Sequence, residues 1–214
     1  MAVKKEDPEA TRAKLLQAAT HVFAEQGFHA ATVREICTRA DVNVAAINYH
    51  FRDKLGLYFE VLRQSIAAID PSSMREAVKK CKSPEDALRL MISGMLQKMS
   101  TAERGAGIVR IVMHEFARPS PALPHVIEEV MRPNYQALRG ILGRILDLDP
   151  DDRTTRLCAH SVVGQIVHYA LARPVIERLW PEFEWTPKSL ERVANHISEF
   201  TLDSLKKRAK KKHK

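Results

Sequence analysis

Residues 32–54, TVREICTRADVNVAAINYHFRDK, are the most informative segment of the chain. Its pattern predicts two short helices separated by a tight turn and followed at once by the start of a third, which is the layout of a helix-turn-helix. The second helix runs from about Val44 to Phe51, where Ile47 and Phe51 supply one apolar stripe. Its other side chains are small, polar or aromatic, and this composition suits close approach to another surface rather than burial in a core.

Capping residues mark the helix boundaries of this stretch. Thr32 and Glu35 form the Thr-x-x-Glu pattern of a capping box, in which each side chain satisfies a backbone N–H of the other residue. Asn43 is a favourable N-cap for the second helix, and Asp53 is one for a third helix that begins near Lys54. Residues 41–42 then form the turn.

The rest of the chain also reads as helices punctuated by proline and glycine, so we expect an all-α fold. A first helix should begin at Asp7-Pro8 and end at Gly27. The other expected helices span about residues 54–69, ended by 70–73; 84–99, capped by Ser83; 108–116, after a flexible 105–107; 121–146, with Pro133 inside it; 152–172; and 187–207, capped by Thr186.

Three segments follow from this pattern. Residues 1–53 are expected to form an N-terminal three-helix domain, and residues 54–206 a helical ligand-binding and dimerisation domain. Residues 207–214 form a basic tail, for which a solvated extension of the last helix and an arm that adds affinity for DNA are both open.

Charge by itself is a weak guide to function here. The net charge of the 214 residues is +8, but the tail from residue 206 holds seven Lys or Arg, and the rest of the chain is close to neutral. Basic residues in the N-terminal domain must therefore be placed at particular points to contact phosphate. Arg34, Arg52 and Lys54, which flank the second motif helix, have that placement.

Residues 10–62 resemble the N-terminal domain of TetR-family transcriptional regulators. The resemblance rests on Leu15, Leu16, Ala19, Phe23, Gly27, Phe28, Thr32, Ile36, Ala40, Val42, the run Asn48-Tyr49-His50-Phe51, and Lys54. Residues 113–146, with an Arg-Pro-Ser-Pro-Ala-Leu connector and an Arg-Pro inside the next helix, are similar to the CerR or YbiH-like subgroup of that family. The resemblance implies a DNA-binding domain followed by a domain that binds an inducer and dimerises.

The expected DNA-binding residues divide by role. Thr32, Arg34, Tyr49, His50 and Lys54 are predicted to contact the sugar–phosphate backbone. Side chains on the second motif helix are predicted to meet base edges, with the asparagine amide pairing with adenine and the methyl groups meeting thymine. These residues are Val44, Ala45, Ala46 and Asn48.

Few base-reading positions exist in one copy, so we expect a homodimer that binds a palindromic operator. Small and apolar residues between Leu157 and Leu171, including Gly164, together with the last helix, suit a dimer interface. Packing within one subunit is the alternative.

A small-molecule inducer is expected to bind the second domain among adaptable apolar walls and a few polar groups. The predicted ligand residues are Met91, Met95, Met113, Phe116, Tyr135, Gln165, His168 and Tyr169.

Other classes of function find less support. The sequence lacks Gly-rich phosphate loops, G-x-S-x-G and H-E-x-x-H, so we expect no enzyme activity, no cofactor and no metal. Three widely spaced cysteines and the lack of a signal peptide or a long apolar run indicate a cytoplasmic protein without a membrane span. The expected function is therefore that of a ligand-responsive transcriptional regulator that acts as a repressor. An architectural DNA-binding protein and a protein-interaction module are the alternatives.

Overall fold

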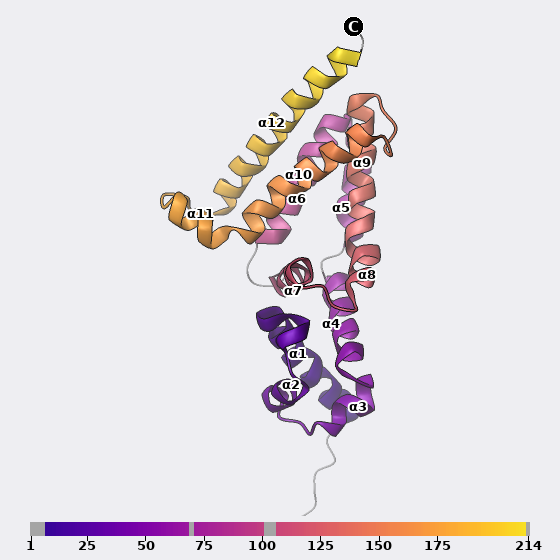
Figure 1. Ribbon diagram of the computed structural model, residues 1–214, viewed down its shortest axis with the longest axis vertical. Coiled ribbons are helices and arrows are strands. Elements are labelled where there is room, and N and C mark those ends of the chain that lie inside the picture. Colours follow the sequence, from indigo (N-terminus) through magenta and orange to yellow (C-terminus); the bar gives the residue numbers. More distant parts are fainter. Residues whose placement is uncertain (1–6, 69–70, 101–105, 213–214) are drawn as a thin grey trace, which may run out of the picture. The chain divides into compact units, whose positions relative to one another are not determined.

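A computed structural model describes residues 7–68, 71–100 and 106–212, and within these ranges every regular element is a helix (Figure 1). This confirms the all-α prediction. Asp70, Gly105 and the last two residues of the basic tail, all named in the sequence analysis, lie outside these ranges. Within the same ranges, no helix has the length and apolar character needed to cross a membrane.

The chain divides into two compact units, one comprising residues 1–69 and 103–129 and the other residues 70–102 and 130–214. These units differ from the predicted segments, in which the N-terminal domain ended at residue 53. The first unit keeps the helix that follows the motif, and it also recruits residues 103–129 from the middle of the chain. Local sequence patterns carry no signal for such long-range recruitment.

The first unit is organised around one central helix, α1, which contacts α2, α3, α4 and α7. Fully buried side chains such as Leu15, Val22 and Phe23 give α1 its inward face, and Ile36 and Ile47 meet the same core from the motif helices. The helices of this unit are α1 (Pro8–Ala30), α2 (Val33–Ala40), α3 (Ala45–Phe51), α4 (Lys54–Ala68), α7 (Ala106–Ala117) and α8 (Leu123–Val126).

Gly27 interrupts α1 but does not end it as predicted, because the helix resumes and runs to Ala30. Its backbone has φ of 72°, a conformation that favours glycine. A Cβ atom at this position would lie 2.9 Å from Cγ of His114 on α7. The glycine therefore permits both the bend in α1 and the close approach of α7, and the His114 ring lies with Nε2 3.3 Å from the Ala24 carbonyl oxygen.

A buried carboxylate joins α7 to α4. Glu115 is only 1% exposed, and its Oε1 accepts a hydrogen bond of 2.7 Å from the hydroxyl of the fully buried Tyr58. Its Oε2 accepts a second bond of 2.9 Å from the backbone N–H of Ser120. Burial, reinforced by the Glu115 carboxylate, raises the pKa of the Tyr58 hydroxyl, so the proton stays on the phenol.

A half-buried charge cluster links α1, α3 and α4. The Glu60 carboxylate accepts bonds of 2.6 Å from Arg63 and 2.7 Å from Arg12. The Arg12 guanidinium also lies 5.4 Å from the centre of the Phe51 ring. The hydrogen bonds from Arg63 and Arg12 lower the pKa of Glu60 to about 2, despite partial burial, which acts in the opposite direction.

The second unit is a bundle in which α6 contacts α5, α9, α10 and α12 (Figure 1). Its core is aliphatic, with Leu88, Ile92, Leu138, Leu142 and Ile166 almost fully buried. Its helices are α5 (Pro71–Lys79), α6 (Pro84–Ser100), α9 (Arg132–Leu146), α10 (Arg153–Leu171), α11 (Arg173–Leu179) and α12 (Pro187–Lys212).

The helix expected across residues 121–146 is not continuous α-helix, so that prediction was wrong in part. A π-helical turn, Ile127–Met131, separates α8 from α9, and Pro133 lies in the first turn of α9. The proline has no N–H to donate and its ring crowds the preceding turn, so the wider turn falls immediately before it.

The starts of α6 and α12 agree with the caps predicted from the sequence. Ser83 and Thr186 cap α6 and α12 as expected, each accepting a bond from the backbone N–H three residues later. The sequence pattern did not predict α5 or α11. It also placed residues 106–107 in a flexible segment, whereas they open α7. The last helix extends to Lys212, so the described part of the predicted tail is helical.

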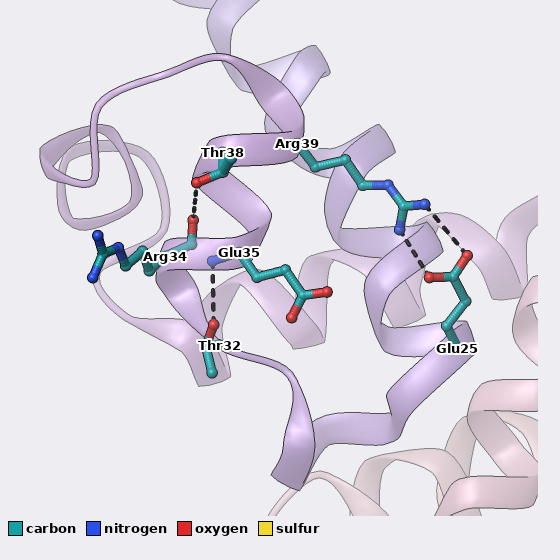
Figure 2. Close-up of a pocket in the computed structure, with 6 residues that line it drawn as sticks. All are labelled: Glu25, Thr32, Arg34, Glu35, Thr38 and Arg39. Carbon is teal, nitrogen blue, oxygen red and sulfur yellow. Dashed lines mark hydrogen bonds and ion pairs between the residues drawn. The ribbon is translucent and has the colours of Figure 1, made fainter.

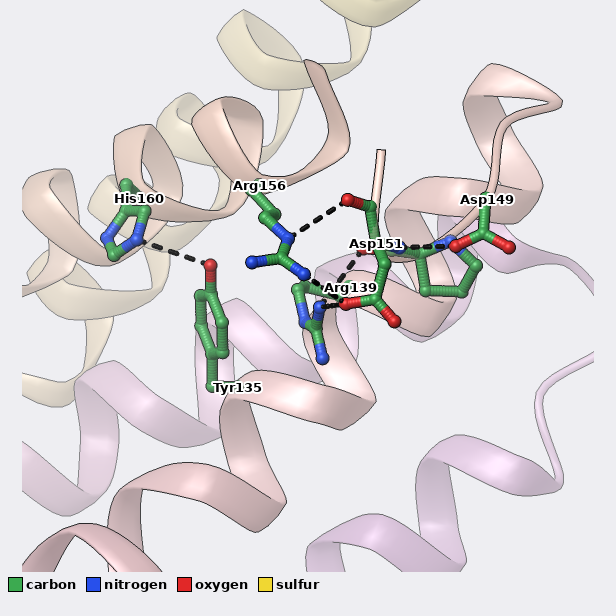
Figure 3. A network of polar contacts seen from close by, with 7 residues as sticks. Tyr135, Arg139, Asp149, Asp151, Arg156 and His160 are labelled. Carbon is green, nitrogen blue, oxygen red and sulfur yellow. Dashed lines mark hydrogen bonds and ion pairs between the residues drawn. The ribbon is translucent and has the colours of Figure 1, made fainter. Parts of the chain in front are cut away.

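An ion-pair network closes the turn between α9 and α10 (Figure 3). The Asp151 carboxylate pairs with Arg139 of α9 and, at 2.7 Å, with Arg156 of α10. The hydrogen bond from Arg139 is the largest cause of a lowered pKa of the Asp151 carboxyl group, and the bond from Arg156 acts in the same direction. In the same view, the Tyr135 hydroxyl lies 3.2 Å from Nε2 of His160.

Replacing Tyr58 with Phe should destabilise the protein by about 1–3 kcal/mol, because the buried Glu115 carboxylate loses a donor. Urea unfolding at fixed protein concentration measures this change. Tyr135→Phe removes an exposed hydroxyl bond and serves as the control, with an expected change within about 0.5 kcal/mol. Equal effects of the two substitutions would contradict the role assigned to the buried network.

The Glu60 cluster predicts an acid-dependent loss of stability. The pKa of Glu60 is lower in the folded chain than its ordinary value of 4.5, so the cluster stabilises the protein fully above that pH. This contribution is lost as pH falls from 4.5 toward 2. Glu60→Gln should therefore cost stability at neutral pH and progressively less in acid, as measured by urea unfolding across this pH range. The exposed Glu191→Gln variant should follow the wild-type curve, and parallel curves for Glu60→Gln and wild type would refute the assignment.

Candidate DNA-binding surface

The first motif helix, α2, begins as the capping pattern predicts. The Thr32 hydroxyl accepts a bond of 3.1 Å from the backbone N–H of Glu35. The Glu35 carboxylate accepts from the side-chain amide of Gln26 on α1, so the reciprocal half of the expected capping box goes to a tertiary partner instead. Thr32 is exposed at the start of α2, where the helix dipole favours an anion.

The turn between the motif helices is stabilised by local hydrogen bonds. Asp41 adopts the left-handed conformation with φ of 55°, and the Val42 N–H donates to the Cys37 carbonyl at 3.0 Å. The Asn43 side chain then accepts a bond of 2.9 Å from the Ala45 N–H. Asn43 thus acts at the start of α3, although regular helix begins at Ala45, one residue later than expected.

The second motif helix, α3, has one buried and one open face. Ile47 is fully buried and Phe51 nearly so, as the apolar stripe predicts. Tyr49 is 79% exposed, and its ring meets His50 edge-on with centroids 4.8 Å apart. Of the remaining positions, Ala46 and His50 are half-buried, and the exposed ones are Val44, Ala45 and Asn48.

Tight geometry fixes the end of α3 against α4. Arg52 has φ of 71°, and the Asp53 carboxylate caps α4 by accepting a bond of 2.7 Å from the Gly56 N–H. A Cβ atom at Gly56 would lie 2.1 Å from the Phe51 carbonyl oxygen, so a larger residue cannot fit without moving backbone. The open face of α3 is therefore held by a rigid frame.

Lys54 has a structural role that sequence reasoning did not anticipate. Its ammonium donates to the carbonyl oxygens of Phe28 at 2.9 Å and Ala31 at 3.0 Å, and it lies 4.4 Å from the Phe28 ring centre. Partial burial lowers its pKa. Two of the three N–H groups thus satisfy carbonyls after the Gly27 bend, and the predicted phosphate contact rests on the third.

A shallow hollow of about 470 Å³ lies on the surface beside α2 (Figure 2). Thr32 and Arg34 line it at the start of the helix. Glu25 and Arg39 close another part through an ion pair of 2.9 Å, and the Glu35 carboxylate also lines the hollow. Arg34 is exposed, and among the described residues its guanidinium has no ion pair, as a phosphate contact requires.

The structure thus brings the predicted DNA-binding residues onto α2, α3 and the first residue of α4, all within one unit. The predicted ligand residues are divided. Met113 and Phe116 lie on α7 in the first unit, and the other six lie in the second unit. Within the second unit, Met91 belongs to the core, whereas Met95, Tyr135 and Tyr169 pack against it.

The other two predicted ligand residues of this unit, Gln165 and His168, are not among the residues of the core or those packed against it. His168 is exposed and Gln165 half-buried on α10. A groove of about 570 Å³ near the α11–α12 connection has Tyr169, Trp180, Phe183, Arg192 and His196 among its lining residues. Tyr169 is the one predicted ligand residue in that lining as far as the described residues go. The aromatic part of this groove had no helical periodicity by which sequence reasoning could find it.

Comparisons with known proteins agree with this architecture. Residues 15–61 match the family model described as bacterial regulatory proteins, tetR family, and residues 84–205 match the C-terminal domain of the HTH-type transcriptional dual regulator CecR. The chain is 28% identical over 178 residues to CecR of Shigella flexneri, covering 78% of this chain and 79% of that protein. It is 26% identical over 166 residues to the transcriptional regulator AcrR of the same organism, covering 76% and 77%.

A solved structure shares the fold. The transcriptional regulator FadR from Bacillus subtilis, in complex with stearoyl-CoA, superposes with a TM-score of 0.64 at 20% identity, covering 89% of this chain and 97% of that one. The two family matches, the helix-turn-helix geometry and the helical second unit give one conclusion. The chain belongs to the TetR family of bacterial transcriptional regulators, and its C-terminal domain is of the CecR type.

Proposed function

We propose that this regulator binds a palindromic operator as a homodimer, acts as a repressor, and releases the DNA when a small-molecule inducer binds. The open face of α3 is the observation that carries the proposal. Its small side chains, Val44 and Ala45, let the helix approach the major groove, and Asn48 presents an amide that can pair with adenine.

Contacts to the sugar–phosphate backbone would flank this helix. The 79% exposed Tyr49 and its neighbour His50 project polar groups at one side, and Thr32 and Arg34 do so at the start of α2. Lys54 would add the remaining N–H of its ammonium. The proposed surface uses a few placed charges, which agrees with the nearly neutral composition of this part of the chain.

Dimerisation would use the exposed face of α10 together with α12. Leu157 is 59% exposed on α10 and Phe200 is 64% exposed on α12, although both are large apolar residues. Gly164 lies between the ends of the α10 face, and a Cβ atom there would have no neighbour within 4 Å. Two copies of such a face can approach closely.

Coupling between inducer and DNA would pass through α7. This helix falls within the sequence matched to the CecR C-terminal domain, yet it packs on α1 and α4 of the DNA-binding unit. Any inducer that shifts α7 must also disturb the Glu115–Tyr58 bond and the contact of His114 with Gly27. A relative in fold that holds stearoyl-CoA supports a small-molecule effector in this architecture without identifying the inducer.

The test of this function is selection of random duplex DNA by the purified protein at roughly physiological salt. An enriched palindrome supports a dimeric sequence reader. Binding that follows charge without enrichment favours an architectural protein, and no binding favours a protein-interaction module. Loss of the enriched complex on addition of small molecules then tests the inducer.

Two substitutions separate base reading from phosphate contact. Asn48→Ala should relax the preference at one position of each half-site and cost about 1–3 kcal/mol per contact. Arg34→Gln should weaken all sequences equally and reduce the salt slope by about 1 per subunit. Binding titrations at several salt concentrations measure both effects. Arg89→Gln on α6, an exposed arginine paired with Asp86, is the control and should change neither quantity.

The dimer face gives a separate prediction. Gly164→Arg should yield folded monomers, because the single subunit has room for the side chain whereas the close packing of two copies does not. Sedimentation velocity measures the mass, and circular dichroism checks the fold. Gly140→Arg on α9 is the matched control, since a Cβ atom there also has no neighbour within 4 Å. A dimeric Gly164→Arg variant would place the interface elsewhere.

A further inference from the structure

The groove of about 570 Å³ near the α11–α12 connection, here named the aromatic groove, has three aromatic side chains in its lining. The Phe183 ring joins the other two, with its centroid 5.0 Å from that of Trp180 and 6.3 Å from that of Tyr169. Phe183 is 9% exposed, whereas Trp180 is 52% exposed, so much of the indole is open to a ligand. The volume of the groove lies within the range of small-molecule sites.

Two carboxylates without a partner line the same groove. Glu182 and Glu184 lie on the connector between α11 and α12, and both are exposed. Among the described residues, neither side chain makes a hydrogen bond or an ion pair. Each carboxylate is therefore available to a ligand that carries positive charge.

Two basic side chains of α12 also line the groove, but each has a partner on its own helix. The Arg192 guanidinium donates a bond of 3.1 Å to the hydroxyl oxygen of Ser189. The His196 ring lies with its centroid 6.3 Å from that of Phe200. With Arg192 counted, the two carboxylates still exceed the positive charge of the lining, so the groove favours a cation over an anion.

Another side of the same aromatic cluster already binds a cation of the chain. The guanidinium carbon of Arg173 lies 4.9 Å from the centre of the Trp185 ring, and its Nε donates to the Glu177 carboxylate at 2.8 Å. Trp185 in turn packs edge-on against Phe183, with centroids 5.0 Å apart. An aromatic face and a carboxylate thus hold a cation together here, and the negative face of the ring supplies part of the attraction. Trp180 and the connector carboxylates repeat these two components on the groove side.

We infer that the aromatic groove binds an organic cation, in which an ammonium group is attached to an apolar body. The ammonium lies over the Trp180 indole, close to Glu182 and Glu184, and the apolar body packs along Tyr169 and Phe183. This inference goes beyond the proposed function, because it concerns binding in the groove and does not require that the ligand release DNA.

The test compares three probes that share one apolar body and differ in charge: 3-phenylpropyltrimethylammonium, 3-phenylpropan-1-ol and 3-phenylpropionate. Isothermal titration calorimetry with the full chain, at low salt to limit screening, measures each dissociation constant. We expect the cation to bind about fivefold more tightly than the alcohol, and the carboxylate to bind most weakly. Equal or tighter binding of the alcohol or the carboxylate would overturn the proposed class of ligand. Failure of the cation to bind below about 1 mM would overturn the site itself.

Substitution of the carboxylates tests their part in the site. The double variant Glu182→Gln with Glu184→Gln should raise the dissociation constant of the cation about threefold or more. The matched control is Glu191→Gln with Glu199→Gln, which removes the same charge from exposed positions of α12 outside the lining. The control should stay within about twofold of wild type. Equal effects of the two double variants would show that only the net charge of the chain matters, and would overturn the assignment.

Further variants test the rest of the lining. Trp180→Ala should raise the dissociation constant about threefold or more, whereas Trp180→Phe keeps an aromatic face and should lose less affinity. Leu179→Ala, at the neighbouring exposed position outside the lining, is the matched control and should bind like wild type. Arg192→Gln keeps a donor for Ser189 and removes a repelling charge, so it should bind the cation at least as tightly as wild type. Unchanged binding by Trp180→Ala, or weaker binding by Arg192→Gln, would overturn the site.

Operator binding of the same variants is measured separately, so the two proposals can fail independently. Loss of the cation site would leave the proposed repressor function standing. Absence of an operator would overturn that function and leave cation binding in the groove untouched.

Discussion

The Glu115 carboxylate is 1% exposed and must find hydrogen-bond donors; one donor is distant in the sequence and the other lies five residues away. Tyr58 supplies one from α4 and Ser120 supplies the other from the connector after α7. Because Glu115 is satisfied only when these segments meet, it fixes α7 on the DNA-binding helices. The close approach of His114 to Gly27 depends on the same arrangement.

The motif itself is held by a different kind of interaction. Short-range caps at Thr32, Asn43 and Asp53 set where its helices begin. The Lys54 ammonium and the Arg12 cluster then tie those helices to α1. None of these stabilising contacts involves the exposed side chains of α3. Those side chains are therefore available to contact another surface.

The second unit makes a comparable separation on a single helix. The inner side of α10 contributes Val162 and Ile166 to the aliphatic core. On the outer side of the same helix, Leu157 and Gly164 are exposed. A substitution at these exposed positions of α10 can thus alter the association of two copies of the chain with little effect on the fold. The unit therefore presents exposed apolar residues, Leu157 and Leu171 among them, that its own core does not use.

The helical class, the motif and most caps could be predicted from the sequence, because capping and apolar periodicity act over a few neighbouring residues. The family assignment followed from the same local spacing. Tertiary contacts set the roles of Lys54 and Glu115, the recruitment of α7 and the separation of the predicted ligand residues between two units. These features depend on contacts between residues up to 90 positions apart, such as His114 and Ala24, and no local pattern encodes which distant group will satisfy a buried polar atom.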